Sequence, residues 1–442
     1  MSSGTSVSVP HIVVVGGGAG GLELATKLGD TLGKRGRARI TLIDRARTHL
    51  WKPLLHVVAA GAVRRSQHEL NYLAQAHWHQ FTYRYGEVIG LERAEKMLVI
   101  AEMRDDEGRI ITPECRVQYD TLVMAVGSIT NDFGTPGVGE FAIPMETPEQ
   151  ASRFNRRLVN AFLRANTQAE PVRPGQLHIA IIGAGATGTE LAAELHNTIR
   201  TVISYGLERI DPIRDAHIVV IEAADRILPA LSQRLSNSAQ ALLESLGVEV
   251  RTRARVSRVS TDGVHLADGQ MIPAELVVWS AGVKAPDFLK HFGGLEVNRI
   301  NQLAVLPTLQ ATRDPDIFAI GDCAYCMQAD GSAAIPPRAQ AAHQMAAHVF
   351  RQIQARLAGR PLEKFNYRDF GSLVSLGKYS TVGSLMGSLI GGNLFIEGLF
   401  ARFVYRSLYK MHEAALHGRA ATFWRSLLFR AKDRPTPAVK LH

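Results

Sequence analysis

Residues His11–Asp44 read HIVVVGGGAGGLELATKLGDTLGKRGRARITLID. The segment begins with Ile12–Val15, an apolar run rich in β-branched residues that predicts a buried strand. Directly after this run, Gly16, Gly18 and Gly21 have the spacing G-x-G-x-x-G, and the apolar pattern that follows is helical. A strand, a glycine-rich turn and a helix in this order are typical of a dinucleotide-binding unit.

Each residue of this motif has a separate expected role. Gly16 makes the tight turn, Gly18 lets the backbone approach a pyrophosphate, and Gly21 lets the helix pack close to the strand. The pyrophosphate is expected at the helix N-terminus, where N–H groups without intrahelical partners favour an anion. The next predicted strand, Arg39–Ile43, ends at Asp44, whose carboxylate suits the two hydroxyls of an adenosine ribose.

The same pattern occurs a second time in the chain. His178–Ile182 predicts a strand, and the sequence GAGATGTELA after it closely matches GGGAGGLELA of the first copy. The predicted strand His217–Ile221 then ends at an acid, as in the first copy. Such a repeat predicts two similar units and therefore two separate dinucleotides. The expected nucleotide-binding residues of the second copy are Gly183, Gly185, Gly188 and Glu222.

Three later strands are expected to end near a nucleotide. Tyr119–Gly127 and Leu276–Gly282 both end in small residues, as is needed where the backbone passes close to a ligand. Asp316–Asp322, with the sequence DIFAIGD, ends in an acid that can hydrogen-bond a ribityl hydroxyl or a flavin phosphate. The residues expected to lie beside a nucleotide are Ala125, Gly127, Gly282 and Asp322.

Other segments have more open interpretations. His49–His56 (HLWKPLLH) leads into a helix, and it serves either packing or the placement of Lys52 beside the first nucleotide. Phe81–Ile89 alternates like a single strand and could present the backbone of Val88 to an adenine. Leu98–Val117 predicts a small antiparallel sheet.

The composition of the 442 residues restricts the class of protein. Three cysteines exclude a disulfide framework and favour a reducing compartment, and the N-terminus has no secretory signal. Cys323 and Cys326 form a C-x-x-C pair, which is either redox-active or structural. No further ligands follow at zinc-type spacing, so we expect no metal and interpret the pair as structural.

The net charge of +9 is concentrated at the C-terminal end of the chain. Residues 399–442 contain nine Lys or Arg and two Asp or Glu, a balance of +7, with apolar residues at helical spacing opposite the basic ones. This pattern predicts helices that lie on an anionic membrane surface, and a dimer or core helix is the alternative. No nucleic-acid-binding signature accompanies the charge. Tyr379–Ile396 has too many glycines and serines for a membrane-spanning helix.

Together these segments predict an α/β fold with two Rossmann-like domains and a C-terminal membrane-interface module. Pro144–Arg164 predicts a helix that leads into a polar linker before the second domain. The expected boundaries are 1–145 and 305–375 for the two parts of the first nucleotide domain, 146–304 for the second domain, and 376–442 for the membrane-anchoring region.

Several of these segments resemble the type II NADH:quinone oxidoreductases, most closely the proteobacterial ones, within the two-dinucleotide flavoprotein superfamily. The resemblance is carried by HLWKPLLH, GAGATGTELAAELHN, NRINQLAVLPTLQATRDPDIFAIGDCA, PPRAQAAHQMA and YRDFGSLVSLGKYSTVGSLMG. It implies a glutathione-reductase-like fold and a single-chain respiratory enzyme that does not pump protons. It also implies a homodimer bound peripherally to the cytoplasmic face of the inner membrane, with a membrane quinone as electron acceptor.

The resemblance assigns the two nucleotides. Gly16, Gly18, Gly21, Asp44 and Asp322 are expected to hold FAD. NADH is expected at the second copy of the motif. A carboxylate at the end of its second strand accepts bonds from free ribose hydroxyls and repels a 2′-phosphate, which favours NADH over NADPH.

The resemblance also implies three residues close to the chemistry, Glu190, Gln340 and Gln344. Glu190 is expected in the first turn of the second motif helix. There it orients the nicotinamide amide or relays protons to the quinone, or it merely complements the helix dipole. Gln340 and Gln344 lie four residues apart on a predicted helix and can donate to quinone carbonyls. His343, between them, is expected to be a packing or solvent histidine. The alternative function is a soluble NADH-dependent electron transferase or disulfide reductase.

Overall fold

The structure is a computed structural model that describes residues 9–328, 330–377, 379–387, 392–397 and 416. The chain forms two compact units. The first comprises Met1–Leu50, Glu69–Ile129 and Val283–Arg368, and the second comprises Trp51–His68, Thr130–Gly282 and Asp369–His442. The boundaries expected from the sequence divide the chain by the nucleotide that each domain binds, and they stay a prediction.

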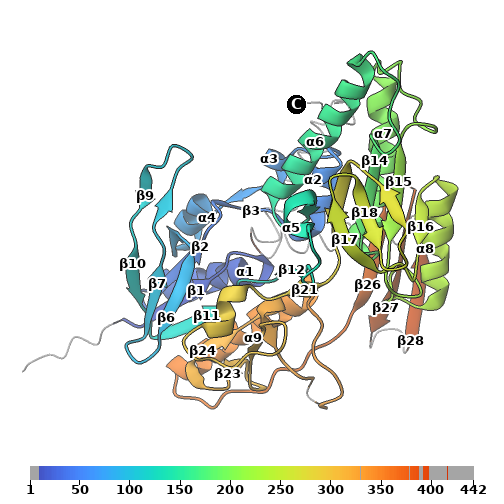
Figure 1. Cartoon of the computed structure of the whole chain (residues 1–442). Helices are drawn as coiled ribbons and strands as arrows, with labels where there is room; N and C mark the ends of the chain where they lie inside the picture. The colour runs from blue at the N-terminus through green and yellow to red at the C-terminus, as the bar shows by residue number, and fades with distance from the viewer. Residues whose placement is uncertain (1–8, 329, 378, 388–391, 398–415, 417–442) are drawn as a thin grey trace, which may run out of the picture. The chain divides into compact units, whose positions relative to one another are not determined.

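The first unit is built on a six-stranded sheet with the order β23-β24-β11-β1-β2-β5 (Figure 1). All neighbouring strands pair in parallel except β23, which is antiparallel to β24. The chain runs outward from β1 to β2 and β5 and later returns to β11 on the other side of β1, so the carboxyl end of β1 is a topological switch point. The strands are β1 His11–Val15, β2 Arg39–Asp44, β5 Thr82–Tyr85, β11 Thr121–Met124, β23 Gln310–Ala311 and β24 Asp314–Ala319.

Helices and smaller sheets complete the first unit. Helix α1, Ala19–Leu28, packs against α9, Ala339–Leu357. The predicted antiparallel sheet is confirmed, because β6 and β10 pair with the two edges of β7 and a hairpin of β8 and β9 extends between β7 and β10. Further elements of this unit are α4 Tyr72–His79, β3 Thr48–His49, β4 Leu70–Asn71, β6 Val88–Glu92, β7 Met97–Ile100, β8 Met103–Arg104, β9 Ile110–Thr112, β10 Cys115–Gln118, β21 Val283–Lys284, β22 Leu303–Ala304 and β25 Ala324–Tyr325.

The second unit repeats this topology in a parallel sheet with the order β13-β20-β14-β15-β16. The chain leaves β14 towards β15 and β16 and returns to β20 on the opposite side, so the carboxyl end of β14 is the second switch point. The strands are β13 Ala142–Pro144, β14 His178–Ile182, β15 His217–Ile221, β16 Glu249–Arg251 and β20 Leu276–Trp279.

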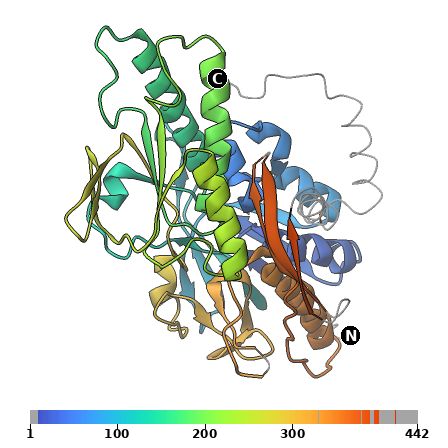
Figure 2. The same ribbon diagram turned by 90° about the vertical axis from the view of Figure 1, so that its right-hand side faces the viewer.

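Figure 2 shows the antiparallel sheet β26-β27-β28 beside helices α7 and α8 of the second unit. Strands β26 and β27 contact α7 and α8, respectively. Further elements of the second unit are α2 Leu55–Ala59, α3 Arg65–His68, α5 Val138–Phe141, α6 Pro148–Thr167, α7 Ala186–Ser204, α8 Gln233–Ser245, β17 Val256–Ser260, β18 Gly263–Leu266, β19 Met271–Pro273, β26 Gly371–Leu376, β27 Ser380–Gly387 and β28 Gly392–Glu397.

Two predicted elements have different boundaries. Phe81–Ile89 is not one strand, because β5 ends at Tyr85 and β6 begins at Val88 in a different sheet. Gly86 separates them, and a Cβ there would lie 2.5 Å from a methyl carbon of Ile100. The helix predicted over Pro144–Arg164 begins only at Pro148, where Thr147 and Gln150 form a capping box.

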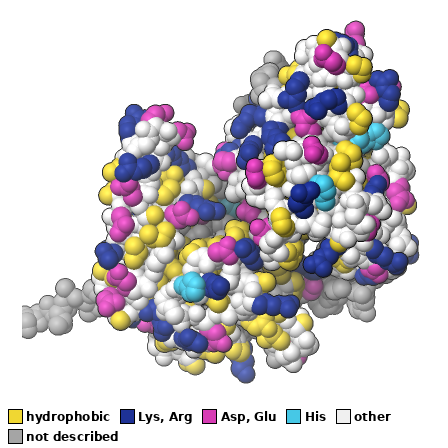
Figure 3. Space-filling model, viewed as in Figure 1, with side chains coloured by type: hydrophobic (Ala, Val, Ile, Leu, Met, Phe, Trp, Pro, Cys, Tyr) yellow, Lys and Arg dark blue, Asp and Glu magenta, His cyan; other side chains and the backbone are white. Residues whose placement is uncertain are grey.

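The C-terminal predictions have mixed outcomes. The uncharged segment Tyr379–Ile396 contributes to strands β27 and β28. Among the described residues no helix is both long and apolar enough to cross a membrane. The two amphipathic helices expected over 399–442 lie outside the described residues, apart from Leu416. On the face displayed in Figure 3, acidic and basic side chains of the described residues are interspersed.

Candidate active site

The first glycine-rich turn has the geometry that the sequence predicts. Gly16 has a φ of +99°, and a side chain on it would overlap the backbone of Ala125 at the end of β11. A Cβ on Gly21 would overlap the carbonyl oxygen of Gly16, so helix α1 lies as close to the turn as a glycine permits. A Cβ on Gly18, in contrast, would have no atom of the described residues within 4 Å, so among these residues the space at the α1 N-terminus is open.

The second turn repeats these features nearly identically. Gly183 also has a φ of +99°, and a Cβ on Gly188 would overlap the Gly183 carbonyl oxygen. A Cβ on Gly185 would likewise have no atom within 4 Å in the part of the chain that the structure describes. Gly18 and Gly185 are the N-caps of α1 and α7, with φ, ψ of −65°, −170° and −70°, −172°. Among the described residues no side chain caps either helix, and neither helix has an acidic residue in its first turn. The N–H groups of each first turn can therefore donate to an anionic ligand.

The acid after each second strand is bound to its turn in the same way. The carboxylate of Asp44 accepts hydrogen bonds from the backbone N–H groups of Gly17 at 2.5 Å and Ala46 at 2.7 Å. Glu222 accepts those of Ala184 at 2.8 Å and Ala224 at 2.9 Å. Each carboxylate oxygen retains a further lone pair for a ribose hydroxyl. Burial raises the pKa of Asp44, although the two backbone bonds and Arg45 oppose this shift.

The other residues expected beside a nucleotide also lie at strand ends. In the first unit, Ala125 donates its N–H to Val15 at 2.7 Å, and Gly127 has a φ of +70° with open space around it. Asp322 follows β24 and accepts a hydrogen bond from the Ser128 hydroxyl at 2.8 Å. In the second unit, Gly282 follows β20 with a φ of +67°. The residues present at both turns therefore fit a dinucleotide. The contact of each named residue with a nucleotide stays a prediction.

Glu190 occupies a different position on its helix from the one expected. Helix α7 begins at Ala186, so Glu190 is its fifth residue and lies beyond the first turn. Its side chain is buried, accepts the Ser375 N–H at 2.9 Å, and lies 3.4 Å from Nδ1 of His56. Burial lowers the pKa of His56 to about 4, so this ring is neutral at physiological pH. The helix-dipole interpretation is therefore wrong, and Glu190 is held within a buried polar cluster.

The two glutamines lie on the predicted helix, which is α9. The amide of Gln344 donates to the Arg368 carbonyl at 2.8 Å and accepts the Arg368 N–H at 3.0 Å. This pair of bonds ties α9 to the segment after it and uses one of the two amide hydrogens. Gln340 lies one turn earlier, next to the helix N-terminus.

His343 pairs with Glu23 where α9 packs on α1. Its Nδ1 contacts the Glu23 carboxylate, which also accepts Lys27 Nζ at 2.5 Å. Burial alone raises the pKa of Glu23, but His343 and Lys27 outweigh burial and hold it below its ordinary value. Glu23 therefore has a structural role, as expected, and His343 is its partner rather than a solvent histidine.

The expected contacts of Lys52 and Val88 with the first nucleotide stay predictions. Lys52 is exposed at the start of a short 3₁₀ helix in the second unit. Val88 is buried at the start of β6, opposite Ile100.

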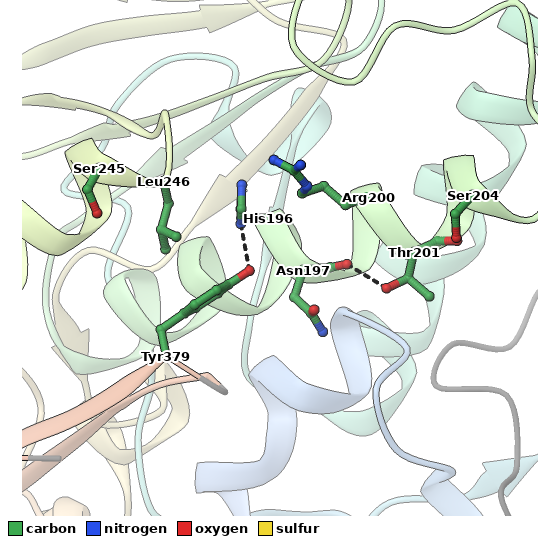
Figure 4. A pocket seen from close by; sticks show the side chains of 8 residues that line it. All are labelled: His196, Asn197, Arg200, Thr201, Ser204, Ser245, Leu246 and Tyr379. Carbon is green, nitrogen blue, oxygen red and sulfur yellow. Dashed lines mark hydrogen bonds between the residues drawn. The ribbon is translucent and has the colours of Figure 1, made fainter.

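A polar pocket of about 460 Å³ lies in the second unit along the C-terminal half of α7 (Figure 4). Tyr379 lines one side, and its hydroxyl is 2.9 Å from Nδ1 of His196. Burial raises the pKa of Tyr379, and Arg200 opposes that shift. The sequence motifs do not point to this pocket.

The cysteines are free thiols, and their environment favours a structural interpretation. Cys323 and Cys326 are both buried, and burial raises the pKa of each to about 11. A thiol with this pKa carries almost no thiolate at neutral pH and is a poor nucleophile. Cys115 is more exposed than the other two.

We expect iodoacetamide at pH 8 to modify one thiol per native chain and three thiols per unfolded chain. The single native product should be at Cys115, because Cys323 and Cys326 are both buried and protonated. Peptide mass mapping measures the sites. Rapid labelling of Cys323 or Cys326 in the native protein would contradict the structural interpretation.

The glycine motif does not predict the contacts of three residues at the first turn, namely Gly17, His49 and Tyr72. Tyr72 Oη donates to the carbonyl oxygen of Gly17 at 2.8 Å, and His49 Nδ1 donates to the same oxygen at 2.9 Å. Both side chains are buried. The sequence holds one signal of this contact, because the first copy of the motif reads GGG where the second reads GAG. The structure gives the reason for the extra glycine, since a Cβ at Gly17 would lie 2.5 Å from the Tyr72 ring.

Two such turns, each at the switch point of its own parallel sheet, define a protein that binds two dinucleotides. The pattern of the family described as "Pyridine nucleotide-disulphide oxidoreductase" matches residues 10–346. A type II NADH:quinone oxidoreductase of Haemophilus influenzae is 40% identical over 98% of this chain and 100% of its own length. One of Mycobacterium tuberculosis is 30% identical over 85% of this chain and 79% of its own. The chain belongs to the type II NADH:quinone oxidoreductases.

Solved structures agree on the fold. NDH2 from Plasmodium falciparum in complex with NADH has a TM-score of 0.80 at 18% identity, covering 98% of this chain and 100% of that one. The sulfide:quinone oxidoreductase of Aquifex aeolicus has a TM-score of 0.71 at 16% identity, covering 97% and 96%. At these identities the likeness concerns the fold alone.

Proposed function

We propose that this chain oxidises NADH and reduces a membrane quinone, with FAD bound at the turn after β1 and NADH at the turn after β14. The observation that carries the proposal is the pair of matching turns. Each has open space at its middle glycine, an uncapped helix N-terminus and an acid bound to the turn. When bound, FAD supplies the chemistry of hydride acceptance and of electron transfer to a quinone.

The residues of the chain bind and orient the reactants. The N–H groups at the start of α1 and α7 bind pyrophosphates, and Asp44 and Glu222 accept ribose hydroxyls. Asp322 accepts a hydrogen bond from the ribityl chain. Glu190, with the neutral His56 beside it, orients the nicotinamide or holds a proton for the quinone.

The glutamines of α9 are proposed to bind the quinone. A neutral amide donates to a quinone carbonyl without a fixed charge near the flavin. Gln344 has one amide hydrogen committed to Arg368 and can donate with the other. Both amides are therefore proposed to donate to the quinone.

We expect Gln340→Leu to lower quinone reduction about tenfold, as loss of one buried hydrogen bond to a substrate does, while flavin bleaching by NADH changes less than twofold. Stopped-flow absorbance separates the two half-reactions. Gln344→Leu serves as the comparison and should also lower the Tm, because it releases α9 from Arg368. Equal losses in both half-reactions of Gln340→Leu would refute its quinone role.

The location and assembly are part of the proposal. The basic residues of 399–442 are proposed to bind anionic lipid at the cytoplasmic face of the inner membrane, each contributing about 1 kcal/mol. We also propose a homodimer and a reaction that does not translocate protons.

Two measurements test the proposal. The purified protein should show the visible spectrum of bound FAD and oxidise NADH with a soluble quinone, and a colourless folded protein would refute it. Deletion of residues 399–442 should release the protein from vesicles containing anionic lipid. A truncated protein that stays bound would refute the lipid assignment while leaving the enzymatic one intact. The disulfide-reductase alternative is disfavoured because Cys323 and Cys326 are buried and protonated.

A further inference from the structure

The peptide between Gly17 and Gly18 has an unusual set of contacts. Its carbonyl oxygen accepts two side-chain hydrogen bonds, from Tyr72 Oη at 2.8 Å and His49 Nδ1 at 2.9 Å. We call these two side chains the carbonyl clamp. On the other side of Gly17, its own N–H donates to Asp44. Gly17 is therefore held by three separate side chains, although it is not one of the three motif glycines.

The protonation states of the clamp are defined by its surroundings. Burial lowers the pKa of His49 to about 4, and His343 adds to this effect, so the ring is neutral. Because a carbonyl oxygen only accepts, the hydrogen of the neutral ring is on Nδ1. Burial also raises the pKa of Tyr72 far above its ordinary value, so its hydroxyl keeps its proton. Both groups are permanent donors at physiological pH.

Fixing this carbonyl also fixes the N–H of Gly18. A trans peptide is planar, and its C=O and N–H bonds point in opposite directions. The clamp therefore directs the Gly18 N–H away from His49 and Tyr72. Gly18 is the N-cap of α1, and a Cβ on it would have open space within 4 Å. This is the space that the proposed function assigns to the FAD pyrophosphate.

The second copy holds the equivalent carbonyl by a different route. The Ala184 oxygen accepts the backbone N–H of Leu228 at 2.8 Å and the Thr189 hydroxyl at 3.3 Å. Two donors on this oxygen are thus common to both turns, while the groups that supply them differ. A feature that recurs with different residues points to a requirement of the site rather than to incidental packing.

We propose that His49 and Tyr72 are positioning residues for FAD, which align the Gly18 N–H for the pyrophosphate by binding the Gly17 carbonyl. This inference rests on the assignment of FAD to the first turn. It also explains Gly17, because the Tyr72 ring occupies the volume that a side chain at this position would need.

The test measures release of FAD from the holoenzyme. Tyr72→Phe keeps the ring against Gly17 and removes only the hydroxyl. We expect FAD release about three- to tenfold faster, the range for loss of one hydrogen bond, with the KM for NADH unchanged. Tyr119→Phe is the matched control. Its hydroxyl is buried in the same unit without a hydrogen-bond partner among the described residues, so FAD release should stay within twofold.

A second pair of variants covers the case in which Tyr72→Phe fails to fold. His49→Leu removes the other donor and should accelerate FAD release, and His49→Asn restores an N–H donor and should slow it again. FAD release within twofold of wild type in Tyr72→Phe, or an equal loss in both His49 variants, overturns the inference. A wild-type protein without FAD would instead refute the proposed function.

Discussion

Replacing Gly185 by alanine is expected to raise the KM for NADH at least about tenfold while leaving the Tm of the FAD-loaded enzyme unchanged. The backbone of Gly185, with φ −70° and ψ −172°, suits any residue, and a Cβ there meets no atom of the described residues within 4 Å. The new methyl group would instead occupy the space proposed for the NADH pyrophosphate. Steady-state kinetics and thermal unfolding measure the two effects separately.

Gly188→Ala is the matched comparison for that experiment. Its Cβ would overlap the Gly183 carbonyl oxygen, so it must displace α7 from the turn and lower the Tm. The two alanines differ in position by three residues and add the same methyl group. An unchanged KM in Gly185→Ala would place NADH elsewhere, whatever Gly188→Ala does.

The enzyme should prefer NADH over NADPH by about 100-fold in kcat/KM. Two unit charges 4 Å apart interact by about 4 kcal/mol at an effective dielectric of 20, and partial exposure of Glu222 reduces that repulsion. Arg226 gives a 2′-phosphate little help, because its guanidinium donates to Gln233 at 3.2 Å and to the Pro229 carbonyl at 3.1 Å.

The comparison of wild type with Glu222→Gln tests this origin of the preference. Removing the charge should bring the NADH:NADPH ratio of kcat/KM to about tenfold or less, since the amide no longer repels a phosphate. FAD content is the control and should not change, because Asp44 and not Glu222 lies at the first turn. A ratio that stays near 100-fold in the variant would assign the discrimination to other residues.

The sequence was sufficient to predict what local spacing determines. The glycine spacing and β-branched runs predicted β1, β14 and β15 at or within one residue of their ends. The internal repeat predicted that Asp44 and Glu222 occupy equivalent positions, and each accepts the equivalent backbone N–H.

Features that depend on tertiary contacts were missed. The break between β5 and β6 lies at Gly86, where a Cβ would be 2.5 Å from a methyl carbon of Ile100 on the neighbouring strand β7. Tyr72 binds Gly17 from a distance of 55 residues, and the bond of Ser375 to Glu190 spans 185. No periodicity or motif around any one of these residues identifies its partner.

Each turn draws its carbonyl donors from its own unit: His49 and Tyr72 in the first, Thr189 and Leu228 in the second. The carbonyl of each turn is therefore held by residues of its own unit. A substitution among the donors of one turn leaves the donors of the other turn in place. A duplicated binding unit of this kind is modular, and its two copies are free to diverge.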